Sequence, residues 1–334
     1  MNKRMILGCL LSVSVGCGGG GGGMDSGPVG GDDAGPDTNT GPVDSAVCAN
    51  TDAGMQVMPS TALTIQMGTP VMAVPGDLTC LGTATRPAGG AATAGVLTVT
   101  EFLPPSAPTA STMVDIFSTN VITDTCAAPD CMTVTTDSMG QAMATLPAGA
   151  WTAFHIHQSA ATAEVLAYSF PWTSTAGGTV GTNSFSSSTV TLVSTLLQRM
   201  LQTTTAGAIS GQVNDCMGHH LQNAEARVFH GTTQIVDGPA CNHASPRITG
   251  LEGTSLTRDG LTGPSGTFVG ANVPVGDDYH VEIWGVTTAG SAPRLVGCEE
   301  GRVVAGGITV LSIGPLRSDY VAGSACATAA AAAH

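Results

Sequence analysis

Residues 136–151 read TDSMGQAMATLPAGAW, and residues 262–279 read TGPSGTFVGANVPVGDDY. Both stretches run from a threonine through a turn that ends in glycine to a short alternating strand, and then to Pro-x-Gly and an aromatic residue. In each copy the glycine, Gly140 or Gly266, supplies the positive φ that the turn needs, and the proline ends the strand. The chain therefore contains a repeated strand–turn–strand unit.

Further alternating segments surround both copies of this unit. A second strand leaves each turn, as WTAFHIH (151–157) in the first copy and YHVEIWGV (279–286) in the second. Another alternating strand precedes each copy, as VDIF (114–117) and ARVF (226–229). Short strands at regular spacing, with turn residues between them, predict a β-sandwich for each copy.

The second copy begins with ISGQVNDCMGHHLQNAEARVF (209–229), which resembles the opening of the carboxypeptidase regulatory-like, or transthyretin-like, domain. His220 and Asn223 stand where that family has proline and glycine. The resemblance implies a non-catalytic Greek-key sandwich of roughly seven strands. The residues that fit the family pattern are Gly211, Val213, Asp215, Gly218, Leu221, Ala224 and Pro274-Val275-Gly276.

We therefore predict an all-β protein with two tandem Greek-key, transthyretin-like β-sandwich domains after a disordered Gly/Pro/Asp tether. The predicted segments are a lipoprotein signal peptide (1–16), the tether (17–47), the first sandwich (48–204), the second (205–326) and a low-complexity, frayed tail (327–334).

One helix is predicted between the two sandwiches, over STLLQRMLQ (194–202). Leu196, Leu197, Met200 and Leu201 would form its apolar face. We expect this helix to cap the junction of the domains.

The first residues have the proportions of an export signal. Two basic residues precede an apolar stretch of eleven, residues 5–15, which is too short to span a bilayer. Ser14-Val15-Gly16-Cys17 resembles a bacterial lipobox, which implies lipid attachment at Cys17. The open alternatives are a second lipobox match that ends at Cys9 and an ordinary signal peptide with a chance cysteine.

The segment after Cys17 contains six glycines and then scattered Pro and Asp, with almost no large apolar side chain. Such a segment cannot bury enough surface to fold, so we expect it to link the lipid to the folded part. It is similar to the tethers of myxobacterial lipoproteins. Gly18, directly after the cysteine, is similar to the pattern of lipoproteins sent to the outer membrane.

Charge and composition exclude several classes of function. The 334 residues carry a formal net charge of −14, which disfavours binding to nucleic acid. The one lysine, Lys3, lies in the predicted signal peptide, so Schiff-base and lysine-base mechanisms are excluded from the mature chain. We found no peptidase, P-loop, dinucleotide or nucleophile-elbow motif, and we expect neither catalysis nor a cofactor.

Eight cysteines remain when Cys9 and Cys17 are set aside, and an even number in an exported chain predicts disulfides. Cys126 and Cys131 are the pair we expect to be bonded, around Pro129, and spacing does not determine the partners of the others. The full set of candidates is Cys48, Cys80, Cys126, Cys131, Cys216, Cys241, Cys298 and Cys326.

We predict no metal site. His155 and His157 are the best metal candidates, because residues i and i+2 of a strand share a face, but the pattern supplies no third ligand. Glu299-Glu300 is expected to be a solvated turn.

The function predicted from these features is a non-catalytic binding or structural module, anchored by lipid at the outer membrane or cell surface. Its partners would be the membrane, through the lipid, and a protein or polysaccharide at the cell surface. A carbohydrate-binding lipoprotein that uses Trp151, Trp172 and Trp284, and a divergent metal-dependent hydrolase, are the alternatives.

Overall fold

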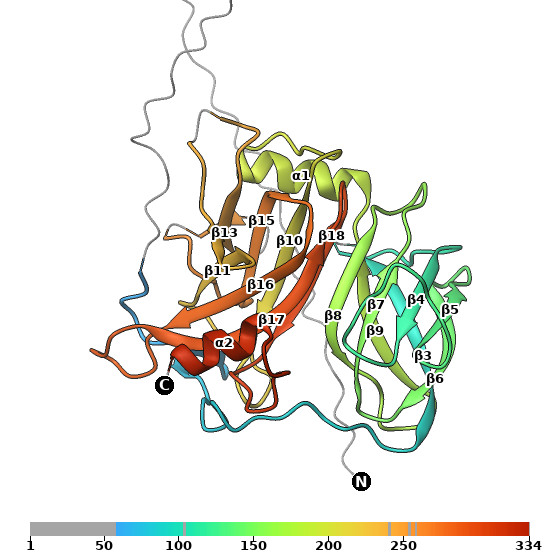
Figure 1. The fold of residues 1–334 in the computed structure, drawn as a ribbon, viewed down its shortest axis with the longest axis horizontal. Helices are drawn as coiled ribbons and strands as arrows, with labels where there is room; N and C mark the ends of the chain where they lie inside the picture. Colours follow the sequence, from blue (N-terminus) through green and yellow to red (C-terminus); the bar gives the residue numbers. More distant parts are fainter. Residues whose placement is uncertain (1–57, 103–104, 240–241, 253–254, 258, 334) are drawn as a thin grey trace, which may run out of the picture. The chain divides into compact units, whose positions relative to one another are not determined.

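The structure, a computed structural model, describes residues 58–333 except 103–104, 240–241, 253–254 and 258. The predicted signal peptide, the tether, Cys17, Cys48 and Cys241 lie outside the described residues. The described part is almost entirely β, and its strands form two sandwiches in tandem (Figure 1). The predicted fold class is confirmed.

The chain passes back and forth between two sheets in the first sandwich. One sheet has the order β6-β3-β9, and the other contains β5-β4-β7-β8. The strands are β3 (Ala92–Glu101), β4 (Met113–Phe117), β5 (Cys131–Thr135), β6 (Gln141–Pro147), β7 (Trp151–Ile156), β8 (Val165–Pro171) and β9 (Gly178–Ser184).

The second sandwich repeats this order, with β15-β10-β18 in one sheet and β12-β11-β16-β17 in the other. A further pair, β14 and β13, extends the first of these sheets beyond β15. The strands are β10 (Ala206–Val213), β11 (Glu225–His230), β12 (Thr233–Ile235), β13 (Arg247–Glu252), β14 (Ser255–Leu256), β15 (Thr267–Pro274), β16 (Gly276–Gly285), β17 (Arg294–Val303) and β18 (Ile308–Ile313).

The turn that identified the repeat has the same construction in both copies. Gly140 has a φ of +70° and Gly266 a φ of +64°. Each glycine carbonyl accepts a 2.8 Å hydrogen bond, from the amide of Val99 in the first copy and Val213 in the second. A Cβ atom on either glycine would lie 2.5 or 2.6 Å from the carbonyl oxygen of that same valine, so glycine is required at both positions.

The two sandwiches share one sheet. Strand β8 of the first sandwich pairs in parallel with β18 of the second, from Val165↔Ile308 to Tyr168↔Leu311. This pairing joins the two sheets into a single sheet of nine of the described strands (Figure 1). The domain boundary at 204/205 therefore falls within a continuous structural unit.

A short hairpin before the first sandwich packs on the second one. It consists of β1 (Thr64–Met67) and β2 (Met72–Pro75). Leu63 and Ile65 are buried in the same apolar core as Leu221 and Val228. A disulfide from Cys80 to Cys216 follows the hairpin. The sequence grouped these residues with the first sandwich, whereas their contacts are with the second.

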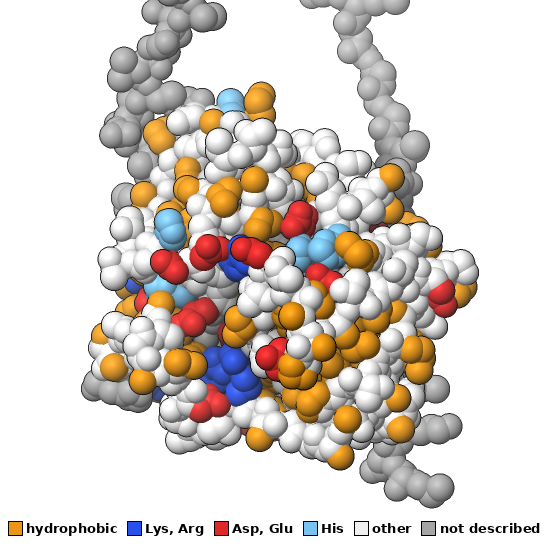
Figure 2. All heavy atoms as spheres, turned by 45° about the vertical axis from the view of Figure 1, so that its right-hand side comes forward, with side chains coloured by type: hydrophobic (Ala, Val, Ile, Leu, Met, Phe, Trp, Pro, Cys, Tyr) orange, Lys and Arg blue, Asp and Glu red, His pale blue; other side chains and the backbone are white. Residues whose placement is uncertain are grey.

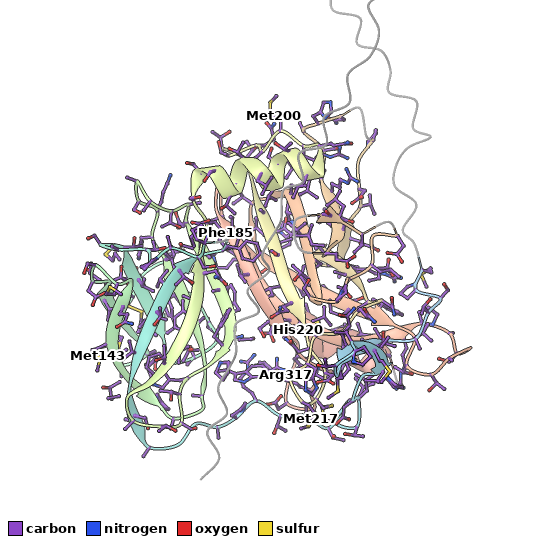
Figure 3. The ribbon with its side chains drawn as sticks, turned by 180° about the vertical axis from the view of Figure 1, so that it is seen from behind. Met143, Phe185, Met200, Met217, His220 and Arg317 are labelled. Carbon is purple, nitrogen blue, oxygen red and sulfur yellow. A yellow bond between two sulfur atoms is a disulfide. The ribbon has the colours of Figure 1, made fainter. Side chains whose placement is uncertain are left out.

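Both described helices differ from the prediction. Helix α1 spans Ser187–Leu197, and Gln198, in the left-handed conformation, ends it. Leu197 is buried against β13 and β15, but Met200 lies beyond the helix and is 69% exposed (Figure 3). The helix begins early because the Ser186 side chain caps it by accepting from the Thr189 amide, which outweighs the low helix propensity of its Thr and Val residues.

The C-terminal segment, expected to be frayed, contains helix α2 (Ala325–Ala332). The Ser324 side chain caps this helix, and the Cys298–Cys326 disulfide fixes its first turn to β17. The alanine-rich composition that suggested low complexity also has the highest helix propensity. Neither described helix is long and apolar enough to cross a membrane.

The structure contains the predicted disulfide between Cys126 and Cys131. The other two disulfides within the described residues, Cys80–Cys216 and Cys298–Cys326, were among the candidates without assigned partners.

Candidate functional site

The candidate site lies on the outer face of the first sandwich, where β4 and β7 run side by side. Asp115 on β4 is directly opposite His155 on β7. His157, two residues after His155, lies on the same face, and its backbone amide donates to the carbonyl of Met113 at 3.0 Å. Ligand atoms of Asp115, His155 and His157 all lie within 4.8 Å of one another.

Each histidine contacts a carboxylate. His157 Nε2 lies 2.8 Å from Asp115 Oδ2, and His155 Nε2 lies 2.8 Å from Glu164 Oε1. The two imidazole rings are neighbours, with their centroids 4.1 Å apart and their planes tilted by 33°. Thr133 on β5 donates to the other oxygen of Asp115 at 2.5 Å, which fixes the orientation of that carboxylate.

The site is partly open to solvent. The exposed fraction is 10% for the Asp115 side chain, 14% for His155 and 29% for His157. Figure 2 shows histidine and acidic side chains beside one another on the surface. The site can therefore be approached from solvent on the side of His157, its most exposed member.

The backbone under the site is held by a packed core. Side chains that alternate with the site residues point to the other face of the sheet and are fully buried there: Val114, Ile116, Phe154 and Ile156. Because the buried face of both strands packs in this core, the side chains on the opposite face are presented on a rigid surface.

The two histidines are recognisable as candidates from the sequence, whereas Asp115 is not. This aspartate belongs to the strand VDIF, which was recognised as a strand, yet 40 residues separate it from His155. Its position opposite His155 depends on the pairing register of β4 and β7. An alternating pattern indicates which face a residue takes, but not which residue lies across the strand pair.

The second sandwich has different residues at the corresponding positions. Arg227 on β11 lies opposite Glu282 on β16, and Trp284 follows two residues later. The Arg227 guanidinium lies 4.4 Å from the centroid of the Trp284 ring, and the indole nitrogen donates to Glu282 at 2.8 Å. Arg227 also pairs with Glu225 at 2.7 Å. These side chains therefore contact one another, although Arg227 Nε and Glu225 Oε1 are buried without a hydrogen-bond partner among the described residues.

The three tryptophans do not form a common platform. Trp172 is 2% exposed in the first core, and its nitrogen donates to the Thr93 carbonyl. Trp284 is covered by Arg227. Trp151 lines a cavity of about 440 Å³ at the junction of the sandwiches, with His220 and Arg317 (Figure 3).

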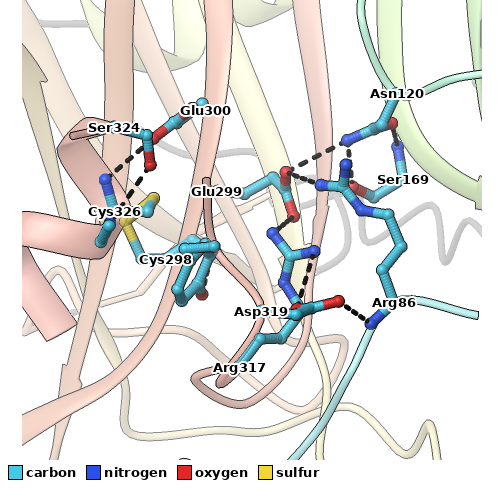
Figure 4. A network of polar contacts seen from close by, with 12 residues as sticks. Arg86, Asn120, Ser169, Cys298, Glu299, Glu300, Arg317, Asp319, Ser324 and Cys326 are labelled. Atoms are coloured by element: carbon cyan, nitrogen blue, oxygen red, sulfur yellow. Dashed lines mark hydrogen bonds and ion pairs between the residues drawn. A yellow bond between two sulfur atoms is a disulfide. The ribbon is translucent and has the colours of Figure 1, made fainter. Parts of the chain in front are cut away.

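The expected solvated turn at Glu299-Glu300 is instead part of strand β17, and this prediction was wrong. Glu299 is 3% exposed, and Glu300 accepts from the backbone amide of Cys326 at the start of α2. The Glu299 carboxylate lies 3.4 Å from an Arg86 nitrogen and 3.7 Å from an Arg317 nitrogen, and it accepts from Asn120 at 3.1 Å (Figure 4).

Burial raises the pKa of Glu299 above its ordinary value, although the guanidinium groups of Arg317 and Arg86 act in the opposite direction. Burial also lowers the pKa of Arg86. Both arginines lie over Trp151, at 5.4 and 5.1 Å from the ring centroid. This network connects the two sandwiches, and its charged groups pair with one another.

The adjacent pair His219-His220 does not converge on one point. His219 Nδ1 lies 3.4 Å from Asp215, whereas His220 Nδ1 contacts Asn214 at 2.9 Å. Burial lowers the pKa of His220.

Comparison with known proteins found no matching family model and no matching curated protein. Among solved structures, the shaft pilin SpaA from Lactobacillus rhamnosus GG is 15% identical, with 69% of this chain and 99% of that chain covered at a TM-score of 0.21. A streptococcal ancillary pilin is 13% identical, with coverage of 67% and 62% and a TM-score of 0.22.

The minor pilin GBS52 of Streptococcus agalactiae is 9% identical, with coverage of 69% and 98% and a TM-score of 0.19. TM-scores this low carry no inference about function.

Proposed function

We propose that the protein is an exported module of the cell envelope, anchored through lipid on Cys17, with a binding or structural role and no catalytic one. The observation that carries this proposal is the set of three disulfides within the described residues. Disulfides form and persist in oxidising compartments outside the cytoplasm. They agree with the export signal and lipobox-like motif at the start of the sequence.

The packing supports a rigid module. The two sandwiches share a sheet, a disulfide connects the β1–β2 segment to the second sandwich, and a buried ion-pair network joins their adjoining faces. Cross-links of this kind limit local opening of the chain.

Of the three tryptophans, only Trp151 remains a candidate for carbohydrate binding. Trp151 borders the cavity of about 440 Å³, whose lining includes the polar side chains of Gln212, Asn214 and Ser312. The guanidinium groups of Arg86 and Arg317 already lie over its ring. A sugar would have to displace one of them to stack on the ring. Titration of the intrinsic fluorescence with envelope polysaccharides, compared between the wild type and Trp151→Phe, tests this alternative.

The anchor is tested by expressing the full chain in a bacterium that processes lipoproteins. The wild-type protein should partition with membranes, and mass spectrometry should find a lipid-modified Cys17 at the mature N-terminus, because two or three acyl chains hold a protein at a bilayer. Cys17→Ser should abolish the modification.

Cys9→Ser is the matched control, because the rival lipobox match ends at Cys9. This variant should still carry lipid on Cys17. An unmodified Cys17, or a mature start beyond residue 17, would contradict the anchor and leave a freely secreted protein.

A further inference from the structure

We propose that Asp115, His155 and His157 bind one divalent transition-metal ion of the zinc class on the outer face of the first sandwich. The proposal goes beyond the envelope role above and does not depend on the lipid anchor. It also departs from the expectation that the chain has no metal site, because the sequence did not supply the third ligand that the fold provides.

The three side chains have the right chemistry and separation. Imidazole nitrogens and carboxylate oxygens are ordinary zinc ligands, and zinc lies about 2.0–2.2 Å from each. Tetrahedral coordination at that distance places ligand atoms about 3.3 Å apart. His157 and Asp115 lie 2.8 Å apart, and the whole set is contained within 4.8 Å, so small side-chain rotations suffice.

Hydrogen bonds from neighbouring side chains orient the three candidate ligands. Thr133 holds the oxygen of Asp115 that does not face His157, as expected for a carboxylate that presents one oxygen to a metal. Glu164 contacts Nε2 of His155, so this histidine would present Nδ1 to the metal and keep Nε2 on Glu164, as metal-bound histidines commonly do with a neighbouring carboxylate. Both histidines already point their Nε2 atoms at carboxylates, which orients them for a cation.

Comparison with the second sandwich indicates that the fold itself does not require Asp115, His155 and His157 at these positions. The same strand pair there carries Arg227, Glu282 and Trp284, which contact one another, and Arg227 also pairs with Glu225. An arginine in place of Asp115 would repel a metal ion. The sheet therefore does not need histidines at these positions to be stable.

The neighbouring disulfide excludes two further candidate ligands, the sulfur atoms of Cys126 and Cys131. Asp115 also lies close to the sulfur atoms of Cys126 and Cys131. Because these two sulfurs are bonded to each other, they are not available as thiolates. The predicted ligands are therefore nitrogen and oxygen atoms alone.

The test is titration of the exported, disulfide-intact protein with Zn²⁺, followed by calorimetry and by metal analysis after dialysis. The wild type should bind one zinc ion per chain, with a rise in melting temperature, because an ion that binds the folded state stabilises it. His155→Ala/His157→Ala should weaken binding at least 100-fold, and Thr133→Val, which disturbs the contact to Asp115, about 10-fold.

Two further variants keep the result interpretable. His157→Gln conserves a hydrogen-bonding group beside Asp115 and should fold normally while losing zinc affinity. His219→Ala/His220→Ala removes the other histidine pair and should bind zinc as the wild type does. The Co²⁺-loaded wild type should show the ligand-field absorption of a nitrogen and oxygen site without thiolate charge transfer.

Three results would overturn the proposal. These are no stoichiometric zinc in the oxidised wild type, unchanged affinity in the folded His157→Gln protein, or zinc binding that occurs only after reductant frees Cys126 and Cys131.

Discussion

The outer faces of the two sandwiches show how one scaffold can carry two different surfaces. On the first, Asp115 and His155 lie opposite each other, and on the second, Arg227 and Glu282 occupy the corresponding positions. In the second sandwich a cation lies against an indole that donates to a carboxylate. In the first, two neighbouring imidazoles each contact a carboxylate, and both lie close to Asp115. Stability requires only that such polar side chains find partners, whereas the choice of partners sets what the surface can bind.

The three described disulfides close loops of very different length in the two sandwiches, and their removal should show the largest effects. Cys80–Cys216 has a sequence separation of 136, Cys298–Cys326 one of 28 and Cys126–Cys131 one of 5. Loop-closure entropy gives these bridges roughly 5, 3.6 and 2 kcal/mol of stabilisation. Alanine pairs should lower the free energy of unfolding in denaturant in that order. An equal loss for all three would mean that loop length does not determine their contributions.

Glu299→Ala should remove the centre of the network between the sandwiches. Arg86 and Arg317 would then remain partly buried without their shared carboxylate, which costs about 3–5 kcal/mol. Equilibrium unfolding measures the loss. Glu164→Ala is the control, because that carboxylate is 32% exposed, and it should cost less than about 1 kcal/mol. A small loss for Glu299→Ala would show that the network does not hold the sandwiches together.

Gly140→Ala and Gly266→Ala compare the two copies directly. Both glycines have positive φ, and in both a Cβ atom would meet the carbonyl of a valine. Each substitution should therefore destabilise the protein by about 1–3 kcal/mol, and by similar amounts. Thermal unfolding of the two variants measures this. A marked difference between the variants would show that the repeated turn does not have the same importance in the two sandwiches.

The repeated sandwich could be recognised in the sequence, but the contacts between distant segments could not. The glycine turn and its flanking strands identified two sandwiches, since turn chemistry and alternation are local properties. The β8–β18 pairing, the position of the β1–β2 hairpin and the partner of Cys80 were not predictable, because each depends on residues more than a hundred positions apart. The burial of Glu299 was missed for the same reason, since its partners Arg86 and Asn120 are distant in sequence.

The smallest expected effect is a change in pH dependence. Burial raises the pKa of Glu299 in the folded protein above its ordinary value of 4.5. Its contribution to stability is therefore fully present below that ordinary value and is lost as the pH rises through the folded-state pKa. The difference in unfolding free energy between the wild type and Glu299→Gln should grow as the pH falls from about 8 to about 5. A difference that shrinks over this range would mean that the folded-state pKa is lowered.

The contrast between the two outer faces is tested most directly by X-ray diffraction from crystals of the oxidised protein grown with Zn²⁺. Anomalous difference maps recorded above and below the zinc edge should show one strong peak between Asp115, His155 and His157. The face formed by Arg227, Glu282 and Trp284 should show none. Density for zinc at the second face, or its absence at the first in crystals that contain zinc elsewhere on the chain, would contradict the account.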